Sequence, residues 1–478
     1  MARVRAASPK WAALSVAERC KQMGRVRDII SQRSEEIANL VTQENGKAKH
    51  DSYWLDVLST LAVMNYFIDN APSILAPERI HLSLVKHRRS YISYQAKGVL
   101  GIITPWNFPF FMPGSDVCMA MLAGNGVVLK PSEVTPLSAL LLKECYDEAG
   151  IDPDLFRVVT GLGQTGAALI DSKPDHLVFT GSVNVGRKIG VACAERFIPY
   201  TLELGGKAPL LALSDADVEL TANAIVWGSF TNGGQICAAV ERVYADESIY
   251  DDLVARVTDK TQALRVGDPA GDRTIDVGSL TTPHQRSTAE RLVEDAVSKG
   301  AKLTTGGKVP DDSKGLFYEP TVLADCDHSM KVMTDEIFGP VVPFMKVSTE
   351  SEAVRHANDS DLGLGGYVFT ENPEKGRRIA EQLEVGSVMI NEVVAHAGVA
   401  EMPWGGVKNS GLGVVRSDRG LKELCHARHI NEDRIKLPVK KSPLWFPYSD
   451  KGLSLVKTLC KNALGGSVVG KFLRAVLR

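Results

Sequence analysis

The chain has 478 residues, of which 44% are hydrophobic and 23% are charged, and its formal net charge is −2. A chain of this length can bury a large core, and typical domain sizes predict two or three domains. The composition excludes wholesale disorder and fibrous or coiled-coil architecture, and the near-neutral charge argues against nucleic acid as a main partner.

The charge is unevenly distributed along the chain. Residues 440–478 contain eight Lys and Arg residues and one acidic residue, Asp450, so this tail carries +7 and the rest of the chain is net acidic. Its Leu, Val and Phe residues lie among these cations in a basic amphipathic pattern. Such a tail suits either the surface of a membrane or packing against the body or a neighbouring subunit.

The N-terminus and the cysteines indicate where the protein works. No apolar run near the start is long enough for a signal-peptide core, so secretion is not expected. The 8 cysteines form no CxxC pair and no cluster with His at metal-ligand spacing, so neither disulfides nor a metal site are predicted. We expect a cytoplasmic protein, with peripheral membrane association if the tail binds lipid.

The first 95 residues predict two helices and an arm. Apolar residues recur every three or four positions over residues 15–45, and a second long helix is expected over 51–69. Residues 80–94 are rich in β-branched and aromatic residues and predict an exposed β arm, which needs a partner edge.

From residue 99 onward, short apolar runs alternate with helical segments. The first series predicts strands at 99–103, 127–129, 156–159, 177–179 and 210–213. Helices are expected near 114–123, 137–149, 163–171, 184–194 and 216–230. A second series predicts strands at 243–245, 321–323, 341–344, 366–369 and 387–390. This alternation is typical of doubly wound parallel sheets, here in two α/β domains joined near 205–210.

Two polar motifs follow predicted strands, at the edge where open α/β sheets bind ligands. The first, TPWNFP, contains Asn107, whose amide donors suit a developing oxyanion, although an Asn in a proline-bounded turn is the alternative. The second, KPSE, places Lys130 and Glu133 three residues apart. This pair is able to hydrogen-bond to the two hydroxyls of a ribose. The alternative is a solvated turn.

A third motif, FTGSVNVG, runs from a strand into a helix over residues 179–186. Its glycines allow the backbone to approach a pyrophosphate at the helix N-terminus. The motif lacks the full G-x-G-x-x-G pattern, so it is a weak nucleotide signature.

Two further motifs carry reactive groups. ELGGK places the Glu203 carboxylate beside two glycines, and GGQICA places the Cys237 thiol in a glycine-rich turn. A thiol with an ordinary pKa of about 8.5 needs a base or a lowered pKa to act as a nucleophile. Taken singly, Glu203 has the alternative of a surface carboxylate, and Cys237 that of buried packing.

The ordered series TPWNFP, KPSE, FTGSVNVG, ELGGK, GGQICA, EIFGP and PWGGVKNSG resembles the aldehyde dehydrogenase superfamily along nearly the whole chain. The resemblance implies an α/β fold with a Rossmann-like NAD-binding domain, an α/β catalytic domain and a small β oligomerisation arm. The expected boundaries are 1–79 with 95–207 for NAD binding, 208–402 for catalysis, 80–94 with 426–434 for the arm, 403–425 for a closing segment and 440–478 for the basic amphipathic extension.

The resemblance also implies residue roles. Cys237 is the expected nucleophile, Glu203 the general base, and Asn107 an oxyanion donor together with the Cys237 N–H. The expected cofactor-binding residues are Trp106, Lys130, Glu133, Gly181, Ser182, Gly186, Glu336 and Phe338. The implied reaction is oxidation of an aldehyde to its carboxylic acid through a thioester on Cys237. Because Glu133 favours a free ribose 2′-hydroxyl, we expect NAD as the cofactor, with NADP as the alternative.

The expected substrate residues are Phe108, Met112, Ser115, Ile236, Ala238 and Trp404. They favour an apolar medium- or long-chain aldehyde, or an aromatic one. Close to Cys237 in the sequence, no Arg is placed to meet a substrate carboxylate, which disfavours a semialdehyde acid. The alternatives are a semialdehyde dehydrogenase and a catalytically silent binding or structural relative. The resemblance further implies a homodimer or homotetramer, with the β arm paired in trans.

Overall fold

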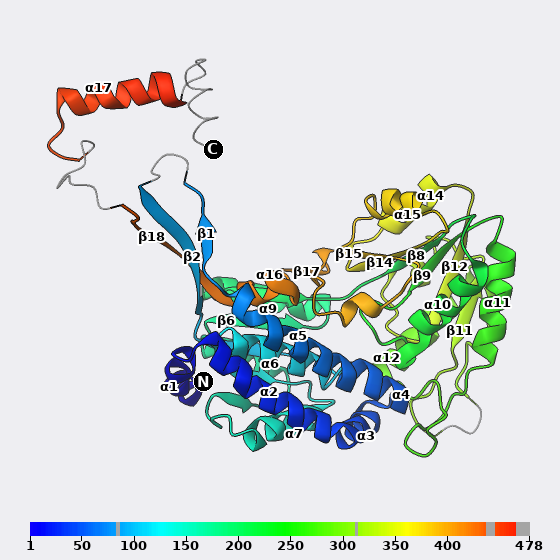
Figure 1. The fold of residues 1–478 in the computed structure, drawn as a ribbon. Coiled ribbons are helices and arrows are strands. Elements are labelled where there is room, and N and C mark those ends of the chain that lie inside the picture. Colours follow the sequence, from blue (N-terminus) through cyan, green and yellow to red (C-terminus); the bar gives the residue numbers. More distant parts are fainter. Residues whose placement is uncertain (83–86, 311–313, 436–444, 465–478) are drawn as a thin grey trace. The chain divides into compact units, whose positions relative to one another are not determined.

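The computed structural model describes residues 1–82, 87–310, 314–435 and 445–464. By its internal contacts the chain forms two compact units (Figure 1). The first comprises residues 1–74 and 95–425, and the second comprises residues 75–94 and 426–478.

Helices make up the first 74 residues. They are α1 Ala2–Ala12, α2 Val16–Gln32, α3 Ser34–Asn45, α4 Lys49–Asp51, the π-helical segment η1 Ser52–Leu58 and α5 Ser59–Ile74. The predicted single helix over 15–45 is wrong in one respect: the chain leaves helical geometry at Arg33, where φ is −92° and ψ is 13°. Ser15 and Glu18 form a reciprocal capping box that fixes the start of α2.

The first sheet has six strands in the order β17-β7-β6-β3-β4-β5. Its strands are β3 Val99–Ile103, β4 Gly126–Lys130, β5 Phe156–Val158, β6 His176–Thr180, β7 Tyr200–Glu203 and β17 Gly411–Leu412. The connecting helices are α6 Phe111–Leu122, α7 Pro136–Glu148, α8 Gly163–Asp171 and α9 Val183–Glu195. Strands β3 to β7 are parallel, and β17 pairs antiparallel to β7. The predicted doubly wound α/β pattern is therefore confirmed.

The second sheet has seven strands in the order β10-β11-β12-β9-β8-β14-β15, all parallel except β10. Its strands are β8 Pro209–Ala212, β9 Arg242–Asp246, β10 Lys302–Thr305, β11 Thr321–Ala324, β12 Val341–Val347, β14 Gly365–Phe369 and β15 Ser387–Ile390. The helices between them are α10 Val218–Phe230, α11 Tyr250–Gln262, α12 Pro283–Ser298, α13 Lys331–Thr334, α14 Glu350–Asn358 and α15 Pro373–Ala380.

The chain crosses from one sheet to the other between Glu203 and Pro209. Every residue of β3, β4 and β8 is buried, which explains why these strands read as continuous apolar runs. Shorter elements complete the first unit. They are the 3-10 turns η2 Thr231–Gly234 and η3 Ala395–Ala397, the pair β13 Leu362–Gly363 and β16 Val407–Lys408, and α16 Ser417–Glu423.

The second unit is built on a three-stranded sheet of β1 Glu78–Ile80, β2 Arg88–Ala96 and β18 Cys425–Asp433. Arg88 forms an ion pair with Asp433, and Arg89 pairs with Glu432. The predicted arm thus contains strands, and its role in assembly stays a prediction.

The tail of the second unit carries α17 Asp450–Thr458 and the π-helical segment η4 Leu459–Leu464. Residues 440–444 and 465–478 of the predicted extension lie outside the described residues. Among the helices that the structure describes, none has the length and apolarity needed to cross a membrane.

Candidate active site

Cys237 follows a tight turn at the end of α10. Asn232, Gly233 and Gly234 have φ values of 52°, 61° and 71°, in the left-handed region. A Cβ on Gly234 would lie 2.3 Å from the Gly339 carbonyl oxygen, so only glycine fits there. The turn places Cys237 on the wall of a cavity of about 370 Å³.

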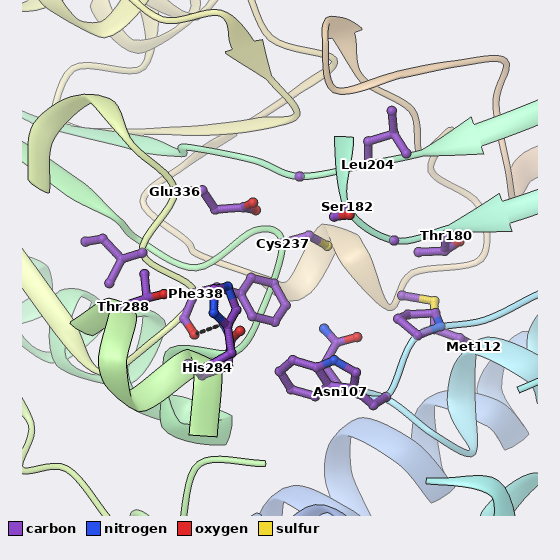
Figure 2. A pocket seen from close by; sticks show the side chains of 16 residues that line it. Asn107, Met112, Thr180, Ser182, Leu204, Cys237, His284, Thr288, Glu336 and Phe338 are labelled. Carbon is purple, nitrogen blue, oxygen red and sulfur yellow. Dashed lines mark hydrogen bonds between the residues drawn. The ribbon is translucent and has the colours of Figure 1, made fainter. Parts of the chain in front are cut away.

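The cavity collects side chains from both halves of the first unit. In Figure 2, Cys237 lies among the labelled side chains, with Glu336 on one side, Met112 on the other and Asn107 below. Thr180 is the last residue of β6, and Ser182 is the N-cap of α9. The predicted nucleophile, oxyanion donor and several predicted cofactor residues therefore share one cavity.

Asn107 is held rigidly beside the Cys237 turn. Its Nδ2 donates to the Gln235 carbonyl oxygen at 2.9 Å. Its own carbonyl oxygen accepts from Asn232 Nδ2 at 3.0 Å and from Lys47 Nζ at 2.7 Å. An amide nitrogen has two protons, so one donor remains for an oxyanion at Cys237.

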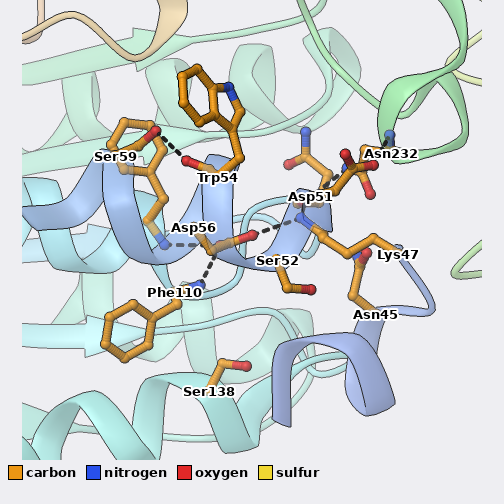
Figure 3. A network of polar contacts seen from close by, with 12 residues as sticks. Asn45, Lys47, Asp51, Ser52, Trp54, Asp56, Ser59, Phe110, Ser138 and Asn232 are labelled. Atoms are coloured by element: carbon orange, nitrogen blue, oxygen red, sulfur yellow. Dashed lines mark hydrogen bonds and ion pairs between the residues drawn. The ribbon is translucent and has the colours of Figure 1, made fainter. Parts of the chain in front are cut away.

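A buried network supports Asn107 from behind (Figure 3). The Lys47 ammonium and the Asp56 carboxylate, both fully buried, are 2.7 Å apart. Asp56 Oδ1 accepts from the backbone N–H groups of Phe110 and Phe111 at 3.0 Å, which fixes the start of α6. Asp51 Oδ2 accepts from Asn232 N at 2.8 Å. Sequence reasoning missed these three charged residues because none belongs to a motif: Asp51 and Asp56 lie in helical segments, and Lys47 lies in the loop between α3 and α4.

Glu203 ends β7 and is buried, and neither of its carboxylate oxygens has a hydrogen-bond partner. Burial raises its pKa well above the ordinary value of 4.5, the Arg416 cation opposes the rise, and the Asp116 and Glu423 carboxyls add to it. A raised pKa makes the ionised carboxylate a stronger proton acceptor. This environment suits a general base.

The Cys237 thiol has a pKa of about 12, raised first by burial and then by the Glu203 and Glu336 carboxyls, while Arg416 lowers it. The resting thiol is therefore protonated at neutral pH. Its attack on a carbonyl requires a proton acceptor or a nearby cation.

A second cavity of about 750 Å³ shares five residues with the first, namely Pro105, Trp106, Thr180, Gly181 and Ser182. The two cavities therefore meet in one groove. Lys130 and Glu133 line the far cavity, where Lys130 Nζ donates to Glu133 Oε2 at 3.1 Å.

Helix α9 begins at the junction of the two cavities. Its N-cap, Ser182, makes no side-chain capping hydrogen bond, which leaves the N-terminal N–H groups of the helix for a ligand. Predicted residue Gly186 lines neither cavity. It lies on α9 against Leu204, where a Cβ would come within 2.4 Å of Leu204 Cδ2, so it permits close packing of helix on sheet.

Glu336 and Phe338 lie at the Cys237 end of the groove. Glu336 Oε1 accepts from Gly206 N at 2.9 Å. The Phe338 ring meets the Trp106 ring edge to face, with centroids 5.5 Å apart. These two rings give a planar ligand an aromatic wall near the thiol.

Of the predicted substrate residues, only Met112 lines the Cys237 cavity. Phe108, Ser115, Ile236, Ala238 and Trp404 are buried and line neither of the two cavities. Trp404 stacks edge to face with His396 at 4.9 Å, and the Ala238 carbonyl oxygen accepts from the Tyr367 hydroxyl.

Arg416 acts on Cys237 although the sequence did not indicate it, and it lines neither of the two cavities. Arg416 is buried and acts electrostatically on Cys237, Glu203 and Asp116. It is far from Cys237 along the chain, and only the folding of residues 404–417 beside β7 brings it there. The residues that surround Cys237 in the sequence therefore give no sign of Arg416. Across the described ranges, no three His, Cys, Asp or Glu side chains group as metal ligands would.

Comparison with known proteins identifies the family of the chain. The aldehyde dehydrogenase family model matches residues 1–430. A 4,4'-diapolycopene aldehyde oxidase of Methylomonas sp is 36% identical over 451 residues, which span 94% of this chain and 83% of the relative. A Mycolicibacterium smegmatis protein, provisionally named succinate-semialdehyde dehydrogenase [NADP(+)], is 35% identical over 91% of this chain and 84% of its own length.

Solved structures agree as well. The betaine aldehyde dehydrogenase of Staphylococcus aureus in complex with NAD+ superposes with a TM-score of 0.86 and 32% identity, over 93% of this chain and 88% of that one. A NAD-dependent aldehyde dehydrogenase from Sinorhizobium meliloti gives a TM-score of 0.87 and 32% identity, over 92% and 87%. The chain therefore belongs to the aldehyde dehydrogenase family and is an oxidoreductase acting on aldehydes.

Proposed function

We propose that the chain oxidises an aldehyde to its carboxylic acid, with Cys237 as nucleophile, Glu203 as general base and Asn107 as oxyanion donor. The observation that carries this proposal is the convergence of the three groups. The Asn107 amide is hydrogen-bonded to the turn that holds Cys237, and the Glu203 carboxyl is near enough to raise the pKa of the thiol.

The chemistry follows from these residue types. The Cys237 thiol loses its proton to water, and the resulting thiolate adds to the aldehyde carbon. The aldehyde oxygen becomes an alkoxide that accepts hydrogen bonds from the Asn107 amide and the Cys237 N–H. A nicotinamide held beside Phe338 and Glu336 would accept the hydride from the substrate carbon, and the acyl group would then remain on Cys237 as a thioester. Glu203 then takes a proton from water, whose oxygen displaces the thiol and yields the acid.

The groove fits a dinucleotide, which we propose is NAD. Its far end offers the Glu133 carboxylate, its middle the N-terminus of α9, and its near end the Phe338 and Trp106 rings. A carboxylate binds a free 2′-hydroxyl and repels a 2′-phosphate, which favours NAD over NADP. The S. aureus neighbour solved with NAD+ supports this choice, whereas the M. smegmatis relative is named for NADP(+).

We propose an apolar medium- or long-chain aldehyde, or an aromatic one, as substrate. Met112 gives the Cys237 cavity an apolar wall. Phe108 and Phe111, which pack edge to face, and Trp404 are buried apolar residues outside the cavity lining. The second candidate is a semialdehyde acid, because the buried Arg416 cation lies close to Cys237. The relatives' names include both a diapolycopene aldehyde and a semialdehyde, so they do not separate the two.

An aldehyde panel tests the proposal. The full chain is assayed with NAD, by the absorbance of NADH, against a series of straight-chain aldehydes, an aromatic aldehyde and succinate semialdehyde. We expect kcat/KM to rise with chain length and to be low for the semialdehyde. The reverse order identifies the semialdehyde candidate, and no turnover with any member points to a catalytically silent relative.

A further inference from the structure

Arg416 is a buried cation that has no role in the mechanism proposed above. The Arg416 side chain is 2% exposed, and its guanidinium carbon lies 4.9 Å from the centroid of the Phe111 ring. Its Nε and Nη1 atoms have no hydrogen-bond partner. Buried guanidinium groups are normally paired through several hydrogen bonds, because burying an unpaired charge is costly. This one therefore calls for a functional explanation.

The backbone of Arg416 is also unusual. Its φ of 58° and ψ of −175° fall in a region populated almost only by glycine. The flanking residues hold it there: Val415 and Trp404 exchange backbone hydrogen bonds of 2.8 and 3.0 Å, and Ser417 N donates to the Ala400 carbonyl oxygen at 2.7 Å. Strained positions of this kind concentrate at functional sites, where the surrounding structure enforces them.

The ionisable groups around Glu203 come from four elements. Asp116 belongs to α6, Cys237 to the nucleophile turn, Arg416 to the loop before α16, and Glu423 to α16. Arg416 is the one cation in this set. Burial raises the pKa of Asp116 to about 7, with Arg416 opposing the rise.

The nearby His396 ring adds no charge to this set. Its pKa is lowered to about 4, first by burial and then by Arg416, so it is neutral at pH 7. Within this set, Arg416 is thus the single cation that stabilises the ionised forms of Glu203, Asp116 and the Cys237 thiol.

We propose that Arg416 is a positioning residue whose charge stabilises the ionised forms of Glu203 and Cys237 in a water-poor site. The Asp116 carboxylate opposes this stabilisation. The inference rests on the proposed function of Glu203 and Cys237. Its physical basis is that a buried cation near an acid favours the charged form of that acid, and a second carboxylate disfavours it. The Nε and Nη1 donors have no other hydrogen-bond partner. The cation is therefore able to stabilise the negative charge of each acid as the two ionise in turn.

The test measures each step against pH in the full chain. An activated aryl ester acylates Cys237 without any hydride transfer, so the burst of phenolate reports attack by sulfur and the steady rate reports hydrolysis with Glu203. The variants are Arg416→Met, which removes the charge and keeps the stem, Arg416→Lys, which restores a charge, and Asp116→Asn, which removes the opposing carboxylate.

For Arg416→Met we expect the rise of each rate with pH to occur at a pH that is higher by roughly one unit or more. Asp116→Asn is expected to move the rise of each rate to lower pH, Arg416→Lys to restore most of the shift, and Arg416→Met with Asp116→Asn to lie near wild type. Opposite shifts from two neighbouring substitutions are not produced by loss of folding. Circular dichroism of each variant provides a separate check on folding.

Two results would overturn the inference. In one, Arg416→Met lowers both rates equally at every pH, which marks a structural role. In the other, the rise of each rate stays at the wild-type pH while KM rises only for aldehydes that carry a carboxylate, which makes Arg416 a substrate anchor. A wild-type chain that releases no phenolate from the ester would instead overturn the proposed function itself, so the two failures are distinguishable.

Discussion

The Lys47 ammonium donates a 2.7 Å hydrogen bond to the main-chain carbonyl oxygen of Asn107, the proposed oxyanion donor. On its other side Lys47 pairs with Asp56 at 2.7 Å, and Asn45 Nδ2 donates to the carbonyl oxygen of Trp106 at 3.0 Å. The loop that carries the proposed oxyanion donor is therefore anchored to the N-terminal helices by side chains, rather than by strand pairing alone (Figure 3).

Replacing Lys47 with Met is expected to damage both stability and catalysis. The change leaves the Asp56 carboxylate buried without its cation, and breaking a buried pair in this way costs about 3–5 kcal/mol. We expect a lower urea midpoint and a slower hydride-transfer step in single-turnover measurements. Lys47→Met combined with Asp56→Asn removes the orphaned charge and should recover part of the stability but not the catalytic rate. A Lys47→Met midpoint equal to wild type would contradict the role of this pair.

The proposed roles of Cys237 and Glu203 predict different kinetic defects. Cys237→Ala should abolish NADH formation at saturating aldehyde. Glu203→Gln should still form NADH in a first turnover and then hydrolyse the thioester slowly, with a steady rate lowered roughly 100-fold or more. Rapid mixing separates the burst from the steady rate. Cys460→Ala, a change at the exposed tail cysteine, is the matched control and should behave as wild type. Normal steady turnover by Glu203→Gln would remove Glu203 as the base.

Burial of Glu203 also predicts an effect on stability. Its folded pKa lies well above 4.5, so between 4.5 and that pKa the folded chain binds more protons than the unfolded chain. The contribution of this group to stability is thus fully present below pH 4.5 and is lost as pH rises. Glu203→Gln, which carries no charge at any pH, should therefore have a higher Tm than wild type at pH 8. The difference should shrink as the pH approaches 4.5. Thermal unfolding at several pH values measures this, and a constant Tm difference across them would contradict it.

The sequence predicts the sheets better than it predicts the charges of the site. Strands such as Val99–Ile103 are apolar throughout because helices cover both faces of the sheet, and the motifs follow directly at their ends. Asp116 lies in a helix whose apolar neighbours give no sign of a buried carboxyl. Arg416 reaches the site only because β17 pairs with the strand that ends in Glu203 and the following loop turns back. Contacts of this kind depend on tertiary structure, which local spacing does not encode.

Glu133 predicts how cofactor choice responds to mutation. Its carboxylate is half-exposed and lies 3.1 Å from Lys130 Nζ, so the two side chains form an ion pair. Glu133→Gln removes the repulsion against a 2′-phosphate and releases Lys130 to bind it. We expect the ratio of kcat/KM for NADP to that for NAD to rise at least about tenfold, equivalent to about 1.4 kcal/mol. Glu144→Gln, on an exposed part of α7, is the matched control. An unchanged ratio would contradict the assignment of Glu133 to the ribose.

The tail predicts binding to anionic vesicles. Along α17 and the start of η4, Leu453, Leu455, Val456 and Leu459 are 53%, 40%, 40% and 38% exposed, and Lys451 and Lys457 lie on the same helix. Exposed apolar residues combined with cations favour a membrane interface, where each Lys or Arg contributes about 1 kcal/mol with anionic lipid. We expect the full chain to float with phosphatidylserine vesicles at low salt, and a chain ending at residue 439 to remain in the dense fraction. Phosphatidylcholine vesicles are the control for charge. Equal flotation of the two chains would instead assign the tail to packing within an oligomer, and size-exclusion chromatography of the shortened chain would then show a smaller assembly.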